Sequence, residues 1–316
     1  MKRLGGPALL WFLKIILFLL LSWFVIERLF LQANFAVELN FFAQNLRTDR
    51  FYFFILALLL MPVNWGLETI KWRVLLKTET TFVNLLKSVV AGITIGFVTP
   101  GRTGEFIGRV LYLDEDNKTK VFYLSSIGGF AQTAASLVTG LPFVYAWSNN
   151  VYLTETVAGF AAAYMLVYFR FDWLNKLISA IPFLQKYGLT IRSAELPGPA
   201  SLVLALSISF IRFFSYLLQY VLLLVFFGVG NNYFSLTLHS VIFLLAQTFS
   251  PLMPLLDVSY RSGTALYLFN DITSNNLAVL GAVLTVWFIN LVVPAIIGYI
   301  FILKKKTFTF SHGIFG

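Results

Sequence analysis

Residues 99–109 read Thr-Pro-Gly-Arg-Thr-Gly-Glu-Phe-Ile-Gly-Arg, and they interrupt an apolar segment with one proline, three glycines and three charged side chains. A second interruption, Pro-Leu-Met-Pro-Leu-Leu-Asp-Val-Ser-Tyr-Arg-Ser-Gly, occupies residues 251–263. A charged side chain at membrane depth is costly and usually faces a functional cavity. Helices broken by proline or glycine at corresponding places in two halves are the best sequence indication of a transporter's binding site. We therefore expect the functional site at these two breaks.

The sequence around the breaks is that of an α-helical membrane protein. The 316 residues are 59% hydrophobic and 12% charged, with a mean hydropathy of +0.81. Soluble domains carry about 25% charged residues, and several apolar stretches here reach the ~20 residues that a helix needs to cross a bilayer. A transmembrane β-barrel would show short alternating segments instead. We predict an all-α polytopic membrane protein that forms one integral membrane domain over residues 1–316.

About six segments are predicted to span the membrane, and two shorter pairs are predicted to enter and return. The spanning helices are expected near residues 8–31, 51–76, 121–147, 151–171, 200–227 and 277–303. The broken pairs are expected near residues 82–98 with 104–113, and 234–250 with 259–269. Because each fragment is short for a hydrocarbon core of about 30 Å, each pair should form a re-entrant hairpin with its tip in protein or water. The first segment is longer than a signal-peptide core and lacks a small-residue cleavage site, so we expect it to be retained.

The placement of Lys and Arg orients these helices, because cytoplasmic loops carry an excess of basic residues. Basic residues at both ends of the chain predict cytoplasmic N- and C-termini in a cell (inner) membrane. The loops at 148–151 and 228–233 lack Lys and Arg and are expected outside. In an alternative topology both broken pairs span fully, which would place Lys118 and Lys120 outside. A basic amphipathic stretch is expected to form an interfacial helix; it contains Lys176, Lys186 and Arg192.

This topology predicts an internal repeat. The order of helix, helix, broken pair and helix occurs over about residues 1–147 and again over 148–306. The first broken pair would enter from the cytoplasm and the second from outside. Such inverted repeats are common in transporters, which hold their substrate at the interface between the repeats. The prediction rests on hydropathy and charge and not on residue identity.

The first break is predicted to bind an anionic headgroup. Arg102, Glu105 and Arg109 are spaced i, i+3 and i+7, which would place them on one face of a helix with a net positive charge. A helix beginning after Pro100 would add free N–H groups and a positive dipole end, and arginine binds phosphate through bidentate hydrogen bonds. The alternative is an internal ion pair that only stabilises the fold. Three small residues would let a ligand or backbone approach closely; they are Gly101, Gly104 and Gly108.

The second break carries fewer charges. Asp257 and Arg261 are spaced i, i+4 and could therefore pair with each other. They follow two prolines, Pro251 and Pro254. During a conformational cycle they could instead exchange partners with the charges of the first break, Arg102 and Glu105. The alternative interpretation is a local helix salt bridge near the outer surface.

One predicted helix carries a polar stripe that could line the same cavity. Asn64, Glu68 and Trp72 fall on one face of the 51–76 segment, with Lys71 beside them. Trp72 and Lys71 are interpreted as interfacial anchors near a helix end. Glu68 could line the cavity or pair with an arginine of the first break, either Arg102 or Arg109.

Two other polar residues lie within predicted helices. Arg212 is deep enough in its helix to need an anionic partner, and Asp257 and Glu105 are the candidates. His239 is expected to be an isolated polar residue and not a catalytic base. The chain has no cysteine, two histidines, and no phosphate loop, dinucleotide fingerprint, HExxH or GxSxG motif. We therefore predict no enzyme activity, no cofactor and no metal, and we assign the net charge of +9 to membrane topology and not to nucleic acid.

Three segments together resemble a known family. They read Asn-Trp-x-x-Glu-x-x-Lys-Trp-x-x-Leu-Leu at 64–76, Gly-x-x-x-Gly at 92–96 and Thr-Pro-Gly-Arg-x-Gly-Glu-x-x-Gly-Arg at 99–109. They resemble the lysylphosphatidylglycerol synthase transmembrane-region family, which comprises flippase-like membrane domains of bacteria and archaea. The resemblance covers most of the chain and is looser in the second half. Where the family often has a proline followed by Gly-x-x-Glu, this chain has Pro254 followed by Asp257 and Arg261.

The resemblance implies a lipid flippase-like protein in which a headgroup crosses a charged cavity while the acyl chains stay in lipid. The expected ligand is an anionic phospholipid or a polyprenyl-phosphate-linked lipid, bound by Arg102, Arg109 and Arg261. Glu105 and Asp257 would balance charge, and either could carry a coupling proton. Because the chain stops soon after Lys306, no synthase activity is expected. The alternatives are a non-transporting membrane subunit, as a homodimer or with a glycosyltransferase or lipid-modifying enzyme, and a membrane-embedded lipid-transfer enzyme.

Overall fold

The computed structural model describes residues 48–113, 118–173, 196–250 and 257–304, together with isolated positions between 16 and 46 and at 176 and 254. All regular elements in these segments are helical, which confirms the predicted all-α class. Within the described residues, five helical segments are long and apolar enough to cross a membrane. They are α3 (Phe51–Leu76), α6 (Lys118–Ser148), α7 (Val151–Phe169), α10 (Pro199–Phe226) and the continuous α13 (Asn276–Trp287), η3 (Phe288–Val292) and α14 (Val293–Lys304).

The protein is therefore a multi-pass membrane protein. The predicted helix at 8–31, Pro251, and the part of the interfacial stretch that contains Lys186 and Arg192 lie outside the described residues. For the other spans the predicted ends are accurate to a few residues. Local signals set them, such as the Asn150 side chain, which accepts a hydrogen bond from the Leu153 N–H at the start of α7.

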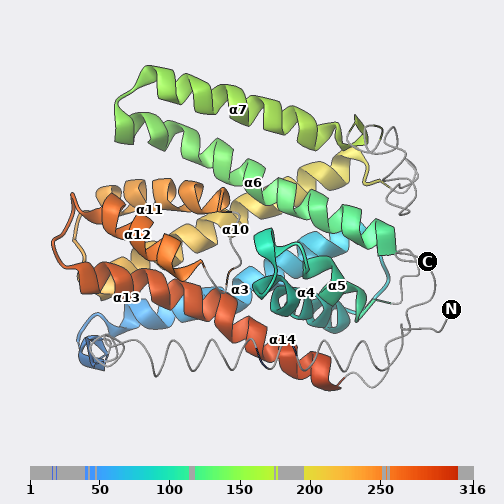
Figure 1. Ribbon diagram of the computed structural model, residues 1–316, viewed down its shortest axis with the longest axis horizontal. Helices are drawn as coiled ribbons and strands as arrows, with labels where there is room; N and C mark the ends of the chain where they lie inside the picture. Colours follow the sequence, from blue (N-terminus) through green and yellow to red (C-terminus); the bar gives the residue numbers. More distant parts are fainter. Residues whose placement is uncertain are drawn as a thin grey trace.

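Two pairs of shorter helices lie among the long ones (Figure 1). The first consists of α4 (Phe82–Phe97) and α5 (Glu105–Val110), joined through the short turn η1 (Pro100–Arg102). The second consists of α11 (Tyr233–Thr248) and α12 (Val258–Phe269). Figure 1 shows α4 and α5 toward the end of the molecule where α6 begins, and α11 and α12 toward the end where α6 stops. The two pairs therefore enter the helix bundle from opposite ends.

Long helices of each predicted half pack against helices of the other half. α3 packs along α10, and these are the second long helices of the predicted halves. α14, at the end of the second half, packs on α4 of the first, and α6, at the end of the first half, packs on α11 of the second. The two predicted halves therefore pack against each other through their long helices and through both broken pairs.

Small residues allow α4, α5 and α14 to pack with their backbones close together. A Cβ atom added to Gly108 of α5 would collide with the carbonyl oxygen of Ala91 in α4. A Cβ atom added to Gly92 of α4 would lie 2.9 Å from the backbone carbonyl oxygen of Glu105. On the other side of α4, the Thr94 hydroxyl donates a hydrogen bond of 3.0 Å to the carbonyl oxygen of Ala295. The backbone path through the first break is thus fixed by contacts at van der Waals distance.

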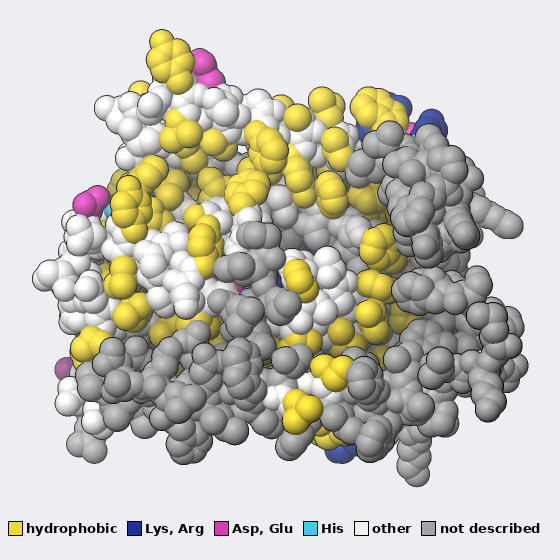
Figure 2. Space-filling model, in the orientation of Figure 1, with side chains coloured by type: hydrophobic (Ala, Val, Ile, Leu, Met, Phe, Trp, Pro, Cys, Tyr) yellow, Lys and Arg dark blue, Asp and Glu magenta, His cyan; other side chains and the backbone are white. Residues whose placement is uncertain are grey.

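The described surface is largely apolar. Hydrophobic side chains cover much of the face shown in Figure 2, and most of the charged side chains in view lie at its margins. A few acidic and basic atoms are also visible near the centre of this face. Long exposed apolar helices bounded by charged ends suit a bilayer environment.

Substitution of Gly108 by alanine tests the close packing of the first pair. The added methyl group must displace the α4 backbone, so we expect Gly108→Ala to reduce the free energy of unfolding by about 3 kcal/mol. Gly263→Ala is the control, because a Cβ there meets no atom within 4 Å and alanine favours helix. Thermal unfolding in detergent measures both, and equal melting temperatures for Gly108→Ala and wild type would contradict the packing argument.

Candidate functional site

One buried carboxylate in the middle of the bundle is shared by three basic side chains. Glu68 of α3 is 7% exposed. Its Oε2 lies 2.8 Å from Lys71 Nζ and also contacts Arg212 Nη1, and its Oε1 accepts a hydrogen bond of 2.8 Å from Arg109 Nη2. The three cations come from α3, α5 and α10, so this one side chain joins three helices.

The helical spacing of α3 explains why its polar side chains point to this place. Positions 64, 68, 71 and 72 lie on one face of the helix, and that face packs against α10 and α6. Asn64, Glu68, Lys71 and Trp72 are all buried. The predicted polar stripe therefore exists, but protein surrounds it on all sides.

Neutral groups accept further hydrogen bonds from two of the cations, Arg212 and Lys71. Asn64 Oδ1 accepts from Arg212 Nε at 2.8 Å, and Gln132 Oε1 of α6 accepts from Arg212 Nη1 at 3.1 Å. Lys71 Nζ donates to the Gly128 carbonyl oxygen of α6 at 3.1 Å. These bonds orient the basic groups without adding negative charge.

The first break extends this group of charges toward its tip. Glu105 Oε2 accepts a hydrogen bond from Arg109 Nη2 at 3.1 Å, and Glu105 Oε1 lies 2.5 Å from Arg102 Nε. The guanidinium carbon of Arg109 lies 4.7 Å from the centre of the Trp72 ring, a cation–π contact. Arg109 Nε is buried and has no hydrogen-bond partner among the described residues.

The resulting cluster carries an excess of positive charge. We call these six side chains the Glu68 cluster, and they are Glu68, Lys71, Arg102, Glu105, Arg109 and Arg212. Four are basic and two are acidic, so the cluster has a net charge of +2 within the described part of the chain. Burying a net charge is costly unless a counter-ion joins it.

The geometry of the first break differs from the prediction in one respect. Arg102 does not share a helix face with Glu105 and Arg109, and no α-helix begins after Pro100. Residues 100–102 form a short turn in which Gly101 and Arg102 have φ values of +54° and +59°, and α5 begins only at Glu105 after Gly104. The prediction that the three charges share one face of a helix beginning after Pro100 was therefore wrong, because the left-handed backbone at Gly101 and Arg102 separates Arg102 from α5.

Two further predictions for the cluster were wrong. Lys71 and Trp72 are not interfacial anchors, since they are 2% and 0% exposed. The i, i+3 and i, i+4 spacing to Glu68 was the signal that could have revealed them. Arg212 pairs with Glu68 and not with Asp257 or Glu105, and Gln132 was not identified because its role depends on how α6 packs.

The second break holds a smaller group of charges with no net charge. Asp257 is 3% exposed, and its Oδ2 lies 2.7 Å from Arg261 Nε, as the i, i+4 spacing predicted. Ser250 Oγ donates to Asp257 Oδ1 at 2.9 Å, and Arg261 Nη1 donates to the Tyr220 hydroxyl of α10 at 3.5 Å. Both breaks thus place an acid four residues before an arginine. In the first break that arginine reaches a carboxylate on the facing helix, and in the second it reaches a neutral phenol.

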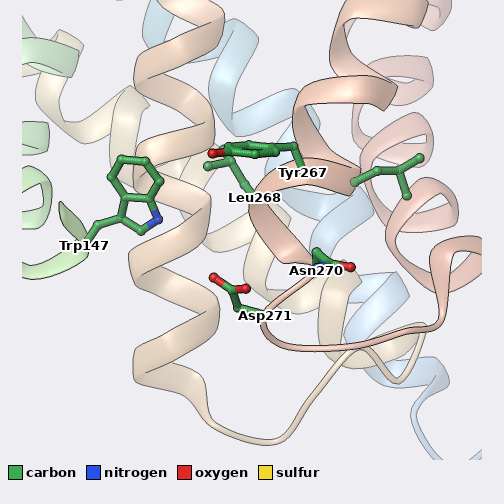
Figure 3. A pocket seen from close by; sticks show the side chains of 6 residues that line it. Trp147, Tyr267, Leu268, Asn270 and Asp271 are labelled. Atoms are coloured by element: carbon green, nitrogen blue, oxygen red, sulfur yellow. The ribbon is translucent and has the colours of Figure 1, made fainter.

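Other polar features of the described chain lie apart from these charges. His239 is buried, and its Nδ1 lies 2.8 Å from the Ser235 carbonyl oxygen, which fits an isolated polar residue. The Pro254 carbonyl oxygen accepts a hydrogen bond from Trp287 Nε1 at 3.1 Å. A pocket of about 330 Å³ lies beside the loop after α12 (Figure 3), and it includes none of the Glu68 cluster. It is lined by Trp147, Leu266, Tyr267, Leu268, Asn270 and Asp271.

Comparison with known proteins adds no identification, since neither a family model nor a curated protein matches the chain. Among the described residues, no group of three His, Cys, Asp or Glu side chains could hold a metal ion. The groups that the Glu68 cluster presents are basic side chains and carboxylates.

Removal of the Glu68 carboxylate tests its place in the structure. We expect Glu68→Ala to reduce the free energy of unfolding by about 3–5 kcal/mol, because it leaves buried cations without their counter-charge. Glu155→Ala, at an exposed position of α7, should change stability by no more than about 0.5 kcal/mol. Both are measured by thermal unfolding in detergent. A Glu68→Ala protein as stable as Glu155→Ala would show that the cations do not depend on this carboxylate.

Proposed function

We propose that this protein is a flippase-like lipid transporter that moves an anionic lipid headgroup through the Glu68 cluster. The observation that carries the proposal is a cluster of net charge +2 that extends from Arg102, in the turn of the first broken pair, to the buried Glu68, Lys71 and Arg109. The resemblance to the lysylphosphatidylglycerol synthase transmembrane-region family, on the residues of the first break, supports the same function.

The charge of the cluster favours an anion that contains phosphate. An anion would relieve the cost of burying excess positive charge, and guanidinium groups match phosphate oxygens through paired hydrogen bonds. Arg102 is the cluster's most accessible cation, with 42% of its side chain exposed, whereas the Arg109 side chain is 5% exposed. Arg102 would therefore meet the headgroup first, and Arg109, Lys71 and Arg212 would bind it deeper in the bundle.

A lipid is favoured over a soluble anion by the surroundings of the cluster. The bundle exposes large apolar side chains along its long helices (Figure 2), which would let acyl chains remain in the bilayer. The headgroup alone would then enter the protein. The apolar exterior suits the acyl chains of a lipid, and the charged interior suits its headgroup.

The two broken pairs suggest how access could alternate. They enter from opposite ends of the bundle, and each carries an acid–arginine pair whose arginine reaches a long central helix. In this proposal a headgroup displaces Glu105 from Arg102 on one side, and the Asp257–Arg261 pair opens on the other. Transporters built from inverted repeats alternate by such movements of one half against the other.

The proposed location is the cell (inner) membrane with both termini in the cytoplasm. The loops at 149–150 and 227–232 contain no Lys or Arg. Basic residues lie at the opposite ends of α6 and α7, at Lys120 and Arg170, and Lys77 follows the end of α3. The positive-inside rule assigns that end to the cytoplasm.

A non-transporting membrane subunit is the second candidate. α7 packs chiefly on α6 and leaves most of its apolar surface facing outward. That surface could contact a second copy of the chain or a lipid-modifying enzyme such as a glycosyltransferase. Under this alternative the Glu68 cluster would stabilise the fold without moving lipid.

Transport by the purified protein in liposomes tests the proposal. Acyl-labelled anionic lipid should cross to the other leaflet at least about tenfold more slowly with Arg102→Gln than with wild type, since a hydrogen bond to a charged group contributes about 1.5–3 kcal/mol. Arg170→Gln is the control, because 54% of that side chain is exposed at the end of α7. Equal rates for Arg102→Gln and wild type would contradict the site, and no protein-dependent transport would contradict the function.

A further inference from the structure

We infer that the Glu68 cluster binds a phosphate group with two negative charges, that of a lipid phosphomonoester, and that the Glu68 carboxylate occupies the place of this phosphate in the present structure. The inference rests on the proposed function and names the class of its substrate. It follows from the convergence of cations, from the charge balance, and from hydrogen-bond donors that the protein itself does not use.

The first argument is the arrangement of basic groups around a single anion. Lys71, Arg109 and Arg212 approach the Glu68 carboxylate from three helices, with both oxygens in contact. A carboxylate can serve each of these cations only in part, since it has two oxygens and one charge. A phosphate monoester has three terminal oxygens and a charge of about −1.5 to −2 at neutral pH. The geometry that holds Glu68 would therefore hold such a phosphate with one oxygen for each cation.

The second argument is the charge balance. The Glu105 carboxylate lies between Arg102 and Arg109, and Glu68 serves the remaining cations. Glu68 remains attached to α3 when a phosphate displaces its carboxylate from the cations, so its charge still counts, and a phosphate with two charges neutralises the net charge of +2 within the described residues. A phosphodiester headgroup has one charge and would leave the buried cluster at +1. Because uncompensated charge is expensive at low dielectric, the cluster should prefer the doubly charged group.

The third argument is the unused hydrogen-bonding capacity of Arg109. Among the described residues this side chain donates only through Nη2, to Glu68 and Glu105, and its buried Nε has no partner. Trp72 lies against one face of the guanidinium and leaves its edge available for hydrogen bonds. A buried arginine usually uses its donors, so a ligand that accepts from Nε would complete the site.

A binding experiment with two lipids tests the charge preference. The full-length protein in detergent is titrated with phosphatidic acid, a phosphomonoester, and with phosphatidylglycerol, a phosphodiester with the same acyl chains. The rise in melting temperature gives the dissociation constants. We expect phosphatidic acid to bind roughly tenfold more tightly or better. Equal affinities would overturn the inference, and inorganic phosphate that binds as tightly as phosphatidic acid would overturn its assignment to a lipid.

Charge variants of the cluster make the test specific. Glu68→Gln removes the competing carboxylate, so it should bind phosphatidic acid roughly tenfold more tightly than wild type even though it melts lower without lipid. Lys71→Met lowers the net charge of the cluster to +1. A phosphodiester would then neutralise it, so the preference for phosphatidic acid should be lost. Glu155→Gln is the matched control, because it makes the same change at an exposed carboxylate on α7. If Glu68→Gln does not fold, Lys71→Met decides: an unchanged preference for phosphatidic acid would overturn the inference.

The outcomes separate this inference from the proposed function. Binding with the expected preference but without transport in liposomes would support the inference and contradict the transport function. Transport of phosphatidic acid and phosphatidylglycerol with equal affinities and rates would support transport and overturn the inference.

Discussion

The Glu68 carboxylate is the interaction on which the centre of this protein depends. It holds together the buried Lys71 and Arg109 and the half-buried Arg212, which come from α3, α5 and α10, and α6 supplies neutral hydrogen-bond acceptors to Lys71 and Arg212. Without it, the polar face of α3 would bring like charges together in an apolar bundle. A buried ion cluster contributes little net stability compared with an apolar core, whereas breaking one is expensive. Its presence in the middle of the bundle is therefore better explained by a need for positive charge there than by stability.

The two breaks share a design and differ in charge. In each, an acid and an arginine four residues apart follow the interruption, and the arginine reaches a long helix of the α3–α10 pair. The first break ends in a cluster of charge +2, and the second in a pair that is neutral. The glycines between α4 and α5 fix the backbone around the charged break at close contact. The asymmetry places the proposed binding chemistry at the first break, to which the second half contributes Arg212 of α10.

The sequence was sufficient for features that depend on local spacing. The helices from residue 51 onward are where hydropathy predicted, to within a few residues, and the Asp257–Arg261 pair follows from i, i+4 spacing. The contact between Glu68 and Arg109 was one of two predicted possibilities. Features that depend on tertiary packing could not be predicted from local sequence spacing. The partner of Arg212 and the burial of Lys71 and Trp72 are set by α10 and α6 covering one face of α3, and the turn at Arg102 is set by two left-handed residues.

The most direct test of the central claim is the identification of the lipid that stays bound to the purified protein. Mass spectrometry of the intact protein, released gently from detergent, compares wild type with Arg109→Gln. The account predicts that wild type retains a lipid with an anionic phosphate headgroup, enriched over its share of the source membrane, and that Arg109→Gln loses it. Bound lipids in the proportions of the membrane, identical in both proteins, would contradict the claim that the Glu68 cluster is a headgroup site.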